Sequence, residues 1–423
     1  MKKINIEKFD LDLYYEKLNN GLEIFVIPKN NCNNIYATFS TKFGSNQIEF
    51  VPIGEKKMLK VNDGIAHFLE HKLFEQKDGV DPFTFYSENG ADANANTNQK
   101  KTTYLFSGST NIEENLTYLL DYVQSPYFTD KNVEKEKGII TQEIKMYQDD
   151  PDTMMYEKII SNCFIKHPMK YPIIGTINSI NKITKEELYK CYNTFYHPSN
   201  MFAVVTGNVD AESIINIIKE NQKNKDFKKQ EEIKVKQYKE PDKVAKKQDS
   251  IKLNVAIPKS CLAYKIRIND YNKLYQTLLY LLILFDAKLG ATSDFVKELV
   301  DKEIINTNLL IDYDNTEEHI ILFIEGETKK PNLLLNEILN EMKKLNVTEK
   351  EFERKKKTLI SSLIYISDNI FSLNHSVMND IIKYNKFNPN KYSDIKNLNY
   401  KDFKNLINNL NLDNYSTFVV NPK

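Results

Sequence analysis

The sequence predicts an α+β fold in which one structural unit is used twice. Short runs rich in β-branched and aromatic residues alternate with longer amphipathic helical patterns. A charged segment with little apolar periodicity, residues 223–250, interrupts this alternation, and the same pattern then resumes. A chain of 423 residues is also too long for one ordinary core, so two domains of roughly 200 residues are the simplest account.

The elements follow in chain order. In the first half we expect strands at residues 21–27, 34–43, 102–109 and 201–207, and helices near 62–76, 111–125, 130–149 and 184–196. In the second half we expect strands near 251–257, 261–268, 307–312, 319–325 and 415–420, and helices near 271–288, 293–302, 329–345 and 349–366. The predicted organisation is an N-terminal domain over 1–222, a charged, solvated linker over 223–250 and a C-terminal domain over 251–423.

The two halves resemble each other directly. Residues 128–143 align with residues 347–362 at a constant offset (347 − 128 = 219), sharing a Thr cap, an acidic first turn and an apolar stripe. In the second copy, Ser362 replaces Glu143 and Lys355 replaces Glu136. We therefore expect only the first copy to carry chemistry.

Composition excludes several function classes. The 58 basic residues equal the 58 acidic ones, so no whole-chain field favours nucleic acid or an anionic membrane. The N-terminus has no continuous apolar segment, and no uncharged run approaches the length of a membrane span. The four cysteines are far apart without a CxxC pair, which is typical of buried thiols in a reducing compartment. We expect a soluble cytoplasmic protein without nucleic-acid or membrane partners.

The stretch GIAHFLEHKLFE, residues 64–75, carries a candidate metal site. On a helix, His67 and His71 project from one face a turn apart, so both imidazoles can reach one metal ion. Glu70 lies at i+3 from His67, where it can accept a proton from a zinc-bound water as general base and pass it to the departing amine. The alternative is a surface helix with two solvated histidines and an incidental acid.

A catalytic zinc site usually has a third protein ligand. The helix expected at 130–149 presents Glu136 and Glu143 two turns apart, and the positions around them, including Ile139, Ile140 and Ile144, are apolar. Either carboxylate could reach the metal. We assign Glu143 as the third ligand and Glu136 as the carboxylate that hydrogen-bonds to a ligand and orients it. Zn²⁺, one ion per chain, is the commonest choice for two imidazoles and a carboxylate.

These motifs resemble a known family. HxxEH is the inverted zinc-peptidase signature, and HFLEHKLFE followed after 143 − 71 = 72 residues by Glu143 is similar to the pitrilysin family, which includes insulysin and the mitochondrial processing peptidase. GADANANTNQKKTTYLF resembles the family's active-site edge strand, which implies that Asn94, Ala95 and Thr97 bind an extended substrate by β-augmentation. By themselves, Asn94 and Ala95 would be interpreted as turn residues in an Asn-rich protein.

The resemblance has a narrower form as well. HFLEHKLFE, VEKEKGIITQEI and FYHPSNM are similar to the zinc-motif member of a bacterial pair of pitrilysin-like proteins associated with 5-aminopentanol modification of elongation factor P. The family fold is two homologous α+β domains, each a mainly antiparallel sheet with helices packed on it. The implied activity is that of a zinc metalloendopeptidase that cuts short extended peptides or unfolded segments inside an enclosed chamber.

One departure from the family pattern bears on partners. Active members carry an Arg and a Tyr seven residues apart in the second domain, and here Val300 and Thr307 occupy those places. The resemblance therefore implies a second pitrilysin-like subunit, in a heterodimer or a homodimer, that supplies the missing groups. Two alternatives remain: a non-proteolytic scaffold subunit of a peptidase-like heteromer, and a hydrolase acting on a non-peptide amide.

Overall fold

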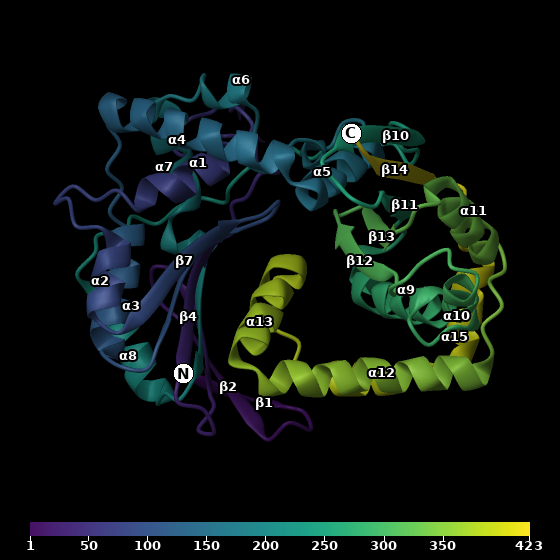
Figure 1. The fold of residues 1–423 in the computed structure, drawn as a ribbon. Helices are drawn as coiled ribbons and strands as arrows, with labels where there is room; N and C mark the ends of the chain where they lie inside the picture. The colour runs from purple at the N-terminus through teal and green to yellow at the C-terminus, as the bar shows by residue number, and fades with distance from the viewer. The chain divides into compact units, whose positions relative to one another are not determined.

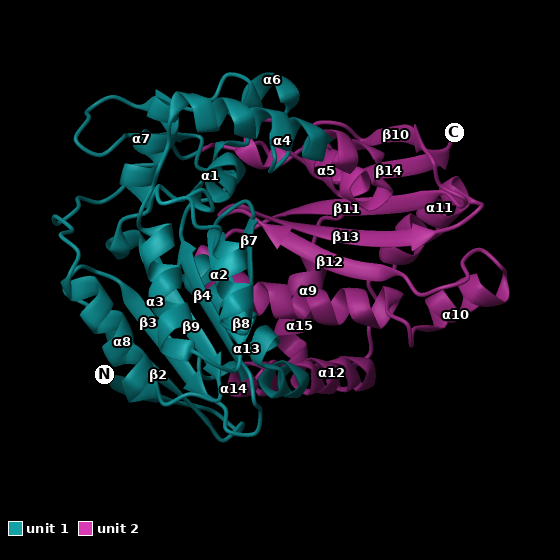
Figure 2. Ribbon diagram, turned by 60° about the vertical axis from the view of Figure 1, so that its left-hand side comes forward, with its two compact units in different colours: residues 1–144, 171–237, 363–391 teal, residues 145–170, 238–362, 392–423 magenta.

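The computed structural model describes residues 1–423, which form two compact units (Figure 1, Figure 2). Unit 1 comprises residues 1–144, 171–237 and 363–391, and unit 2 comprises residues 145–170, 238–362 and 392–423. Each unit thus contains a segment from the other half of the sequence. The units differ in this respect from the chain-continuous domains expected above, since residues 145–170 join the second half and residues 363–391 join the first.

Unit 1 contains a seven-stranded sheet in the order β1-β2-β3-β9-β4-β8-β7. Its strands are β1 (Lys2–Ile6), β2 (Leu11–Lys17), β3 (Glu23–Pro28), β4 (Ile35–Thr41), β7 (Ala91–Thr97), β8 (Thr102–Gly108) and β9 (Met201–Gly207), and a two-stranded sheet is formed by β5 (Glu49–Phe50) and β6 (Leu59–Lys60). Only the pair β3 and β9 is parallel in the large sheet. Strands β4 and β9 are buried along their whole length, whereas β7 lies at a free edge.

Helices cover both faces of this sheet. The helices of unit 1 are α1 (Ile65–Leu73), α2 (Pro82–Glu88), α3 (Ile112–Val123), α6 (Ile177–Ile180), α7 (Lys185–Phe195), α8 (Ala211–Lys223) and α13 (Ile370–Tyr384), and α4 (Asp130–Asp149) begins here and ends in unit 2. In Figure 1, α3 and α8 lie on one side of the sheet and α13 on the other, in agreement with their strand contacts.

Helix α13 joins the first sheet through specific polar contacts as well as apolar packing. Asn374 is fully buried, and its amide donates to the backbone oxygens of Tyr36 (3.2 Å) and Val204 (3.0 Å). Its Oδ1 accepts a hydrogen bond from Thr38 Oγ1 at 3.0 Å. Around it, α13 contributes Leu373 and three further residues to an apolar cluster with strands β3 and β9. These contacts explain why this helix packs with the other half of the sequence.

Unit 2 contains a five-stranded sheet in the order β10-β14-β11-β13-β12. Its strands are β10 (Gln248–Leu253), β11 (Lys259–Arg267), β12 (Leu310–Asn315), β13 (His319–Glu327) and β14 (Tyr415–Pro422). Its helices are α5 (Pro151–Cys163), α9 (Leu274–Leu289), α10 (Asp294–Asp301), α11 (Pro331–Met342), α15 (Tyr400–Asn408), most of α12 (Glu349–Asp368) and α14 (Lys391–Lys396). Only β10 and β14 pair in parallel.

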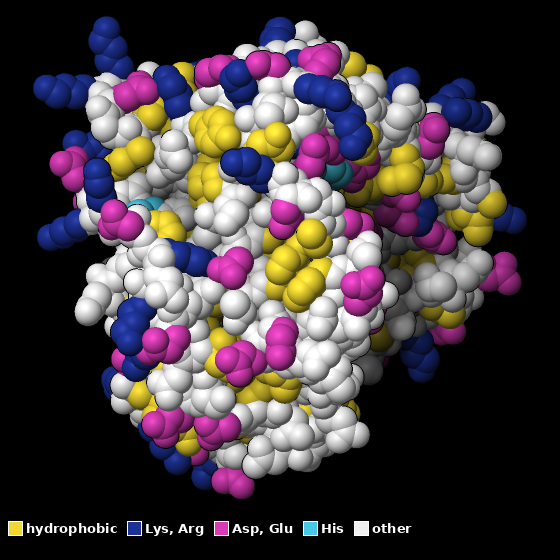
Figure 3. Space-filling model, turned by 90° about the vertical axis from the view of Figure 1, so that its left-hand side faces the viewer, with side chains coloured by type: hydrophobic (Ala, Val, Ile, Leu, Met, Phe, Trp, Pro, Cys, Tyr) yellow, Lys and Arg dark blue, Asp and Glu magenta, His cyan; other side chains and the backbone are white.

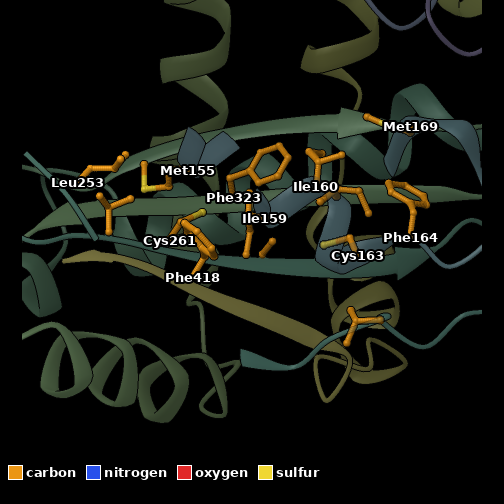
Figure 4. Packing of buried hydrophobic residues seen from close by; sticks show 14 residues of the cluster. Met155, Ile159, Ile160, Cys163, Phe164, Met169, Leu253, Cys261, Phe323 and Phe418 are labelled. Carbon is orange, nitrogen blue, oxygen red and sulfur yellow. The ribbon is translucent and has the colours of Figure 1, made fainter. Parts of the chain in front are cut away.

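Helix α5, from the first half of the sequence, packs on this second sheet. Figure 4 shows Met155 and Ile159 of α5 against Cys261, Phe323 and Phe418 of the strands. All five side chains are at most 3% exposed. The apolar face of α5 is therefore part of the core of unit 2.

The predicted repeat is present in the fold. The strand order β3-β9-β4-β8-β7 in unit 1 corresponds to β10-β14-β11-β13-β12 in unit 2, each beginning with one parallel pair. Helices α4 and α12 both have 20 residues and start 349 − 130 = 219 positions apart. The helices that follow them, α5 and α13, also start 370 − 151 = 219 positions apart. Each copy thus contributes the helix after its long helix to the other unit.

The charged segment 223–250 is not solvated throughout, which corrects the expectation for the linker. Glu240 is only 4% exposed, and its carboxylate accepts hydrogen bonds from the backbone N–H groups of Ile165, Lys166 and His167 at 2.7–2.8 Å. Lys265 Nζ donates to the same carboxylate at 2.8 Å. Strand β10 begins at Gln248, inside the expected linker.

One segment, Tyr271–Asp301, is apolar and long enough to span a membrane, although 67% of its apolar window is buried within the protein, as in a core helix. All four cysteines are free; Cys163, Cys191 and Cys261 are buried as predicted, whereas Cys32 is partly exposed.

On the face in Figure 3, basic and acidic side chains are interspersed rather than gathered into a patch of one sign.

Candidate metal centre

The helix α1 carries the HxxEH residues on the side opposite its apolar face. Gly64 precedes the helix with φ of 87°, and a Cβ there would lie 2.5 Å from the backbone oxygen of Ile174, so glycine is required at this start. Phe68 and Leu69 are fully buried and anchor the helix. The spacing of His67, Glu70 and His71 then directs all three side chains to one side of α1.

The helix α4 brings two carboxylates to the same place. Its buried positions include Val133, Glu136, Ile140 and Ile144, which form a stripe along one face. Ile139, which the sequence suggested for this apolar stripe, is instead 46% exposed. Glu136 and Glu143 both face α1 from this helix, and they contact different atoms of its histidines.

Three side chains converge on one point. Nε2 of His67 lies 3.7 Å from Oε1 of Glu143, and Nε2 of His71 lies 3.4 Å from Oε2 of Glu143. The ligand atoms of these three residues all lie within 4.8 Å of one another. Ligands around a tetrahedral zinc ion with bonds of about 2.0–2.1 Å are separated by about 3.3 Å, and the two separations from Glu143 are close to this value.

Glu136 contacts the other nitrogen of His71. Its Oε1 lies 3.0 Å from Nδ1 of His71, and the glutamate is only 7% exposed. With a proton on Nδ1 donated to Glu136, Nε2 of His71 is left with a lone pair directed at the cluster. The two carboxylates therefore take different positions: Glu143 lies among the ligand atoms, and Glu136 orients one imidazole.

The donor set fits a zinc ion better than a network of ion pairs. Burial, together with the nearby His71, lowers the pKa of His67 to about 3, so this imidazole is neutral and suited to ligation. Oε2 of Glu143 is buried without a hydrogen-bond partner, as is Nδ1 of His67. A buried carboxylate oxygen without a donor is costly, and a metal ion at the cluster would satisfy it.

Glu70 lies beside this cluster in a buried setting. It is 7% exposed, and its Oε2 accepts a hydrogen bond from the hydroxyl of Thr97. Burial raises the pKa of Glu70 to about 6, although the hydrogen bond from Thr97 and the nearby His71 oppose this shift. A carboxylate with a pKa close to neutrality can both accept and return a proton.

The residues assigned to substrate binding lie on the edge strand β7. This strand pairs only with β8, so its outer edge is free of a neighbouring strand. Asn94 is exposed, and its Oδ1 accepts a hydrogen bond from the Ala95 N–H. Thr97 ends the strand and reaches back to Glu70. The edge therefore runs directly to the candidate catalytic carboxylate.

Sequence reasoning missed Lys72. Its side chain is fully buried on α1, and its Nζ contacts Glu75 and lies 3.8 Å from Oε2 of Glu136. The available signal was a lysine at a position where the spacing from Phe68 and Leu69 predicts an apolar residue.

The positions in the second half that the resemblance singled out provide no catalytic groups. Val300 lies in α10 and is 42% exposed, and Thr307 is exposed in the segment that follows. Neither side chain carries a charge or a phenol.

Comparison with known proteins identifies the family of the chain. Residues 50–177 match the model of the insulinase family (peptidase family M16), and residues 182–359 match that of the peptidase M16 inactive domain. An uncharacterized zinc protease of Bacillus subtilis, YmfH, is 44% identical over 364 residues, which cover 84% of this chain and 85% of that protein.

Solved structures give the same result. The crystal structure of an M16-like peptidase from Alicyclobacillus acidocaldarius is similar with a TM-score of 0.93 and 31% identity, over 99% of this chain and 100% of that one. A protease from Helicobacter pylori shares the fold, with a TM-score of 0.82 and 19% identity, over 97% and 99% of the two chains. The two α+β units are thus M16 domains, and the chain belongs to the M16, or pitrilysin, family of zinc proteases.

Proposed function

We propose that this chain is a zinc-dependent metalloendopeptidase that hydrolyses short extended peptides or unfolded segments. The observation that carries the proposal is the convergence of His67, His71 and Glu143 beside the buried Glu70. Membership in a family whose relatives are named zinc proteases supports the same chemistry.

In this proposal, His67 and His71 hold the metal through Nε2, and Glu143 holds it through its carboxylate. When bound there, zinc would supply a Lewis acid that lowers the pKa of a water molecule and polarises the scissile carbonyl. Glu136 keeps the proton of His71 on Nδ1, because its Oε1 accepts from that nitrogen.

Glu70 moves the proton. As general base it takes a proton from the attacking water, and as general acid it gives this proton to the nitrogen of the departing amine. The hydroxyl of Thr97 holds one carboxylate oxygen of Glu70 and leaves the other available for this transfer. The pKa of Glu70, about 6, suits both directions of transfer near neutral pH.

The substrate would bind as an added strand on the free edge of β7, near Asn94, Ala95 and Thr97. Only a chain in extended conformation can pair with an edge strand, so folded proteins should be poor substrates. The resemblance to the pitrilysin family further implies that cleavage takes place inside an enclosed chamber, and we include this in the proposal.

We further propose that a second pitrilysin-like subunit completes the active enzyme, in a heterodimer or a homodimer. Support comes from Val300 and Thr307, which offer neither the positive charge nor the phenol that could stabilise a tetrahedral intermediate. An isolated monomer with full activity on a quenched peptide would rule this out.

We also propose a cytoplasmic location, which the four free cysteines without a disulfide support.

A non-proteolytic scaffold subunit is the alternative, favoured by the match of residues 182–359 to the inactive M16 domain. The discriminating experiment compares wild type and Glu70→Gln, each with and without copurifying proteins, by zinc analysis and cleavage of a quenched extended peptide. If the chain is a peptidase, the Glu70→Gln variant should retain zinc, and its kcat should fall at least about a hundredfold. The exposed Glu134→Gln on α4 serves as control and retains activity. Stoichiometric zinc without cleavage by any preparation would favour the scaffold.

A further inference from the structure

Lys72 is a fully buried lysine one residue after His71. Its side chain has no exposed surface, whereas that of Lys137 on α4 is 15% exposed; Lys101 and Lys29 of unit 1 are also buried, at 4% and 8% exposure. Burying an ammonium group is costly unless it is paired with a carboxylate. Two carboxylates lie near its Nζ: Glu75, which it contacts directly, and Glu136, whose Oε2 is 3.8 Å away.

The contact with Glu75 alone does not explain the burial. Glu75 follows Lys72 by three residues, just beyond the end of α1, and its side chain is 36% exposed, so a pair of this kind could form at the surface. Glu136 lies on α4 and has a side chain only 9% exposed. Lys72 is therefore the buried positive charge that faces the buried negative charge of Glu136.

The carboxylate of Glu136 has a partner at each of its oxygens, a hydrogen bond at Oε1 and a longer ion-pair contact at Oε2. Oε1 lies 3.0 Å from Nδ1 of His71, and Oε2 faces Nζ of Lys72. The last torsion of a glutamate side chain is broad, so one contact would leave the carboxylate free to rotate. Two contacts, from neighbouring residues of α1, restrict this rotation and keep Oε1 on the imidazole.

We propose that Lys72 is a positioning residue of the metal site. Through Glu136 it keeps the ring of His71 oriented so that Nε2 faces Glu143 and His67. The inference rests on the proposed metal site and adds one residue to it, namely Lys72, the cation that faces Glu136. No contact joins Lys72 to the ligand atoms themselves, and the proposed effect on the orientation of His71 passes through Glu136.

The test is a double-mutant cycle on zinc affinity in the full chain. The variants are Lys72→Met, Glu136→Gln and the double variant, and the zinc dissociation constant is measured by competition with a chelator. Removing a residue that orients a ligand costs about 10- to 100-fold in metal affinity, so Lys72→Met should weaken zinc binding about tenfold or more. In the Glu136→Gln background, the same substitution should change affinity by less than about twofold, because residues acting through one contact are not additive.

If Lys72→Met does not fold, Glu136→Gln can still be compared with the double variant, because the double variant buries neither the ammonium of Lys72 nor the carboxylate of Glu136. Lys223→Met is the control, because it removes an exposed pair with Glu220 at the same i,i+3 spacing, and it should bind zinc as wild type does. An additional tenfold loss in the double variant, or unchanged affinity in a folded Lys72→Met, would overturn the role of Lys72. Failure of wild type to bind zinc, or retention of zinc by His71→Ala, would instead refute the metal site.

Discussion

The buried carboxylate of Glu240 should anchor the part of the charged segment 223–250 that belongs to unit 2. Replacement by glutamine keeps the size of the side chain and removes its charge. Three backbone N–H groups and the ammonium of Lys265 then lose their charged acceptor. Lys265 has no exposed side-chain surface, so it would be left as a buried cation without a carboxylate; its remaining partners include the backbone oxygens of Cys163 at 2.9 Å and Pro241 at 2.7 Å and the ring of Phe164.

The magnitude follows from these contacts. Breaking a buried ion pair by removing one partner costs about 3–5 kcal/mol, and the retained amide oxygen of glutamine recovers part of the lost hydrogen bonding. We therefore expect Glu240→Gln to lower the free energy of unfolding of unit 2 by about 3 kcal/mol. Glu232→Gln, an exposed acid in the same charged segment, should stay within about 0.5 kcal/mol of wild type.

The assay is local as well as global. The chain has no tryptophan, so urea unfolding is followed by circular dichroism. Hydrogen exchange of peptides covering residues 160–170 reports the three amides directly, and their exchange should be about a hundredfold faster in Glu240→Gln. A change below about 1 kcal/mol, with unaltered exchange at those amides, would show that the carboxylate does not anchor the segment.

The same group predicts an acid dependence. Burial alone would raise the pKa of Glu240, but the hydrogen bonds from the Ile165 N–H and from Lys265 outweigh it, so the pKa lies below its ordinary value of 4.5. A carboxylate with a lowered folded-state pKa contributes stability above its unfolded pKa and loses that contribution as pH falls through the folded one. The difference in stability between wild type and Glu240→Gln should therefore shrink as pH is lowered from about 5.

Three further predictions concern unit 1. Thr97→Val should lower kcat about tenfold with zinc content unchanged, because Glu70 loses a charge-assisted hydrogen bond; steady-state kinetics measure this, and Thr97→Ser should behave as wild type. Asn374→Ala should cost about 2–3 kcal/mol in urea unfolding, since two buried backbone oxygens each lose one donor and Thr38 Oγ1 loses its acceptor on Asn374, while the exposed Ser372→Ala should be neutral; equal stability of the two variants would contradict the polar docking of α13. Chelation of zinc should lower the melting temperature of wild type but leave that of His71→Ala unchanged, as measured by scanning calorimetry.

The sequence predicted those parts of the fold and site that depend on local pattern. Helix α4 was expected at its observed residues, and the repeat offset of 219 holds for α4 and α12. The helical spacing in HxxEH placed three side chains on one face of α1. The family assignment, made from these motifs, is confirmed by the family models, by a curated relative and by a solved structure.

Other features depend on tertiary contacts and could not be predicted in this way. Glu136 and Glu143 are seven residues apart, which places both on one face of α4. Only the approach of α4 to α1 brings an oxygen of Glu143 to Nε2 of His71 and an oxygen of Glu136 to Nδ1 of the same ring. The exchange of α5 and α13 between the units has no local signal, because each helix is amphipathic in either location. Strand β7 is rich in Asn and Ala, which are poor strand formers, so its edge position came only from the family resemblance.

The proposed chemistry requires one metal ion that is held jointly by α1 and α4. Zinc K-edge X-ray absorption on the purified wild-type chain tests this most directly, because it reports the ligand atoms themselves. We predict two imidazole nitrogens and carboxylate or water oxygens at about 2.0–2.1 Å, with loss of bound zinc in Glu143→Gln. A sulfur ligand at about 2.3 Å, or an unchanged spectrum after that substitution, would contradict the central claim.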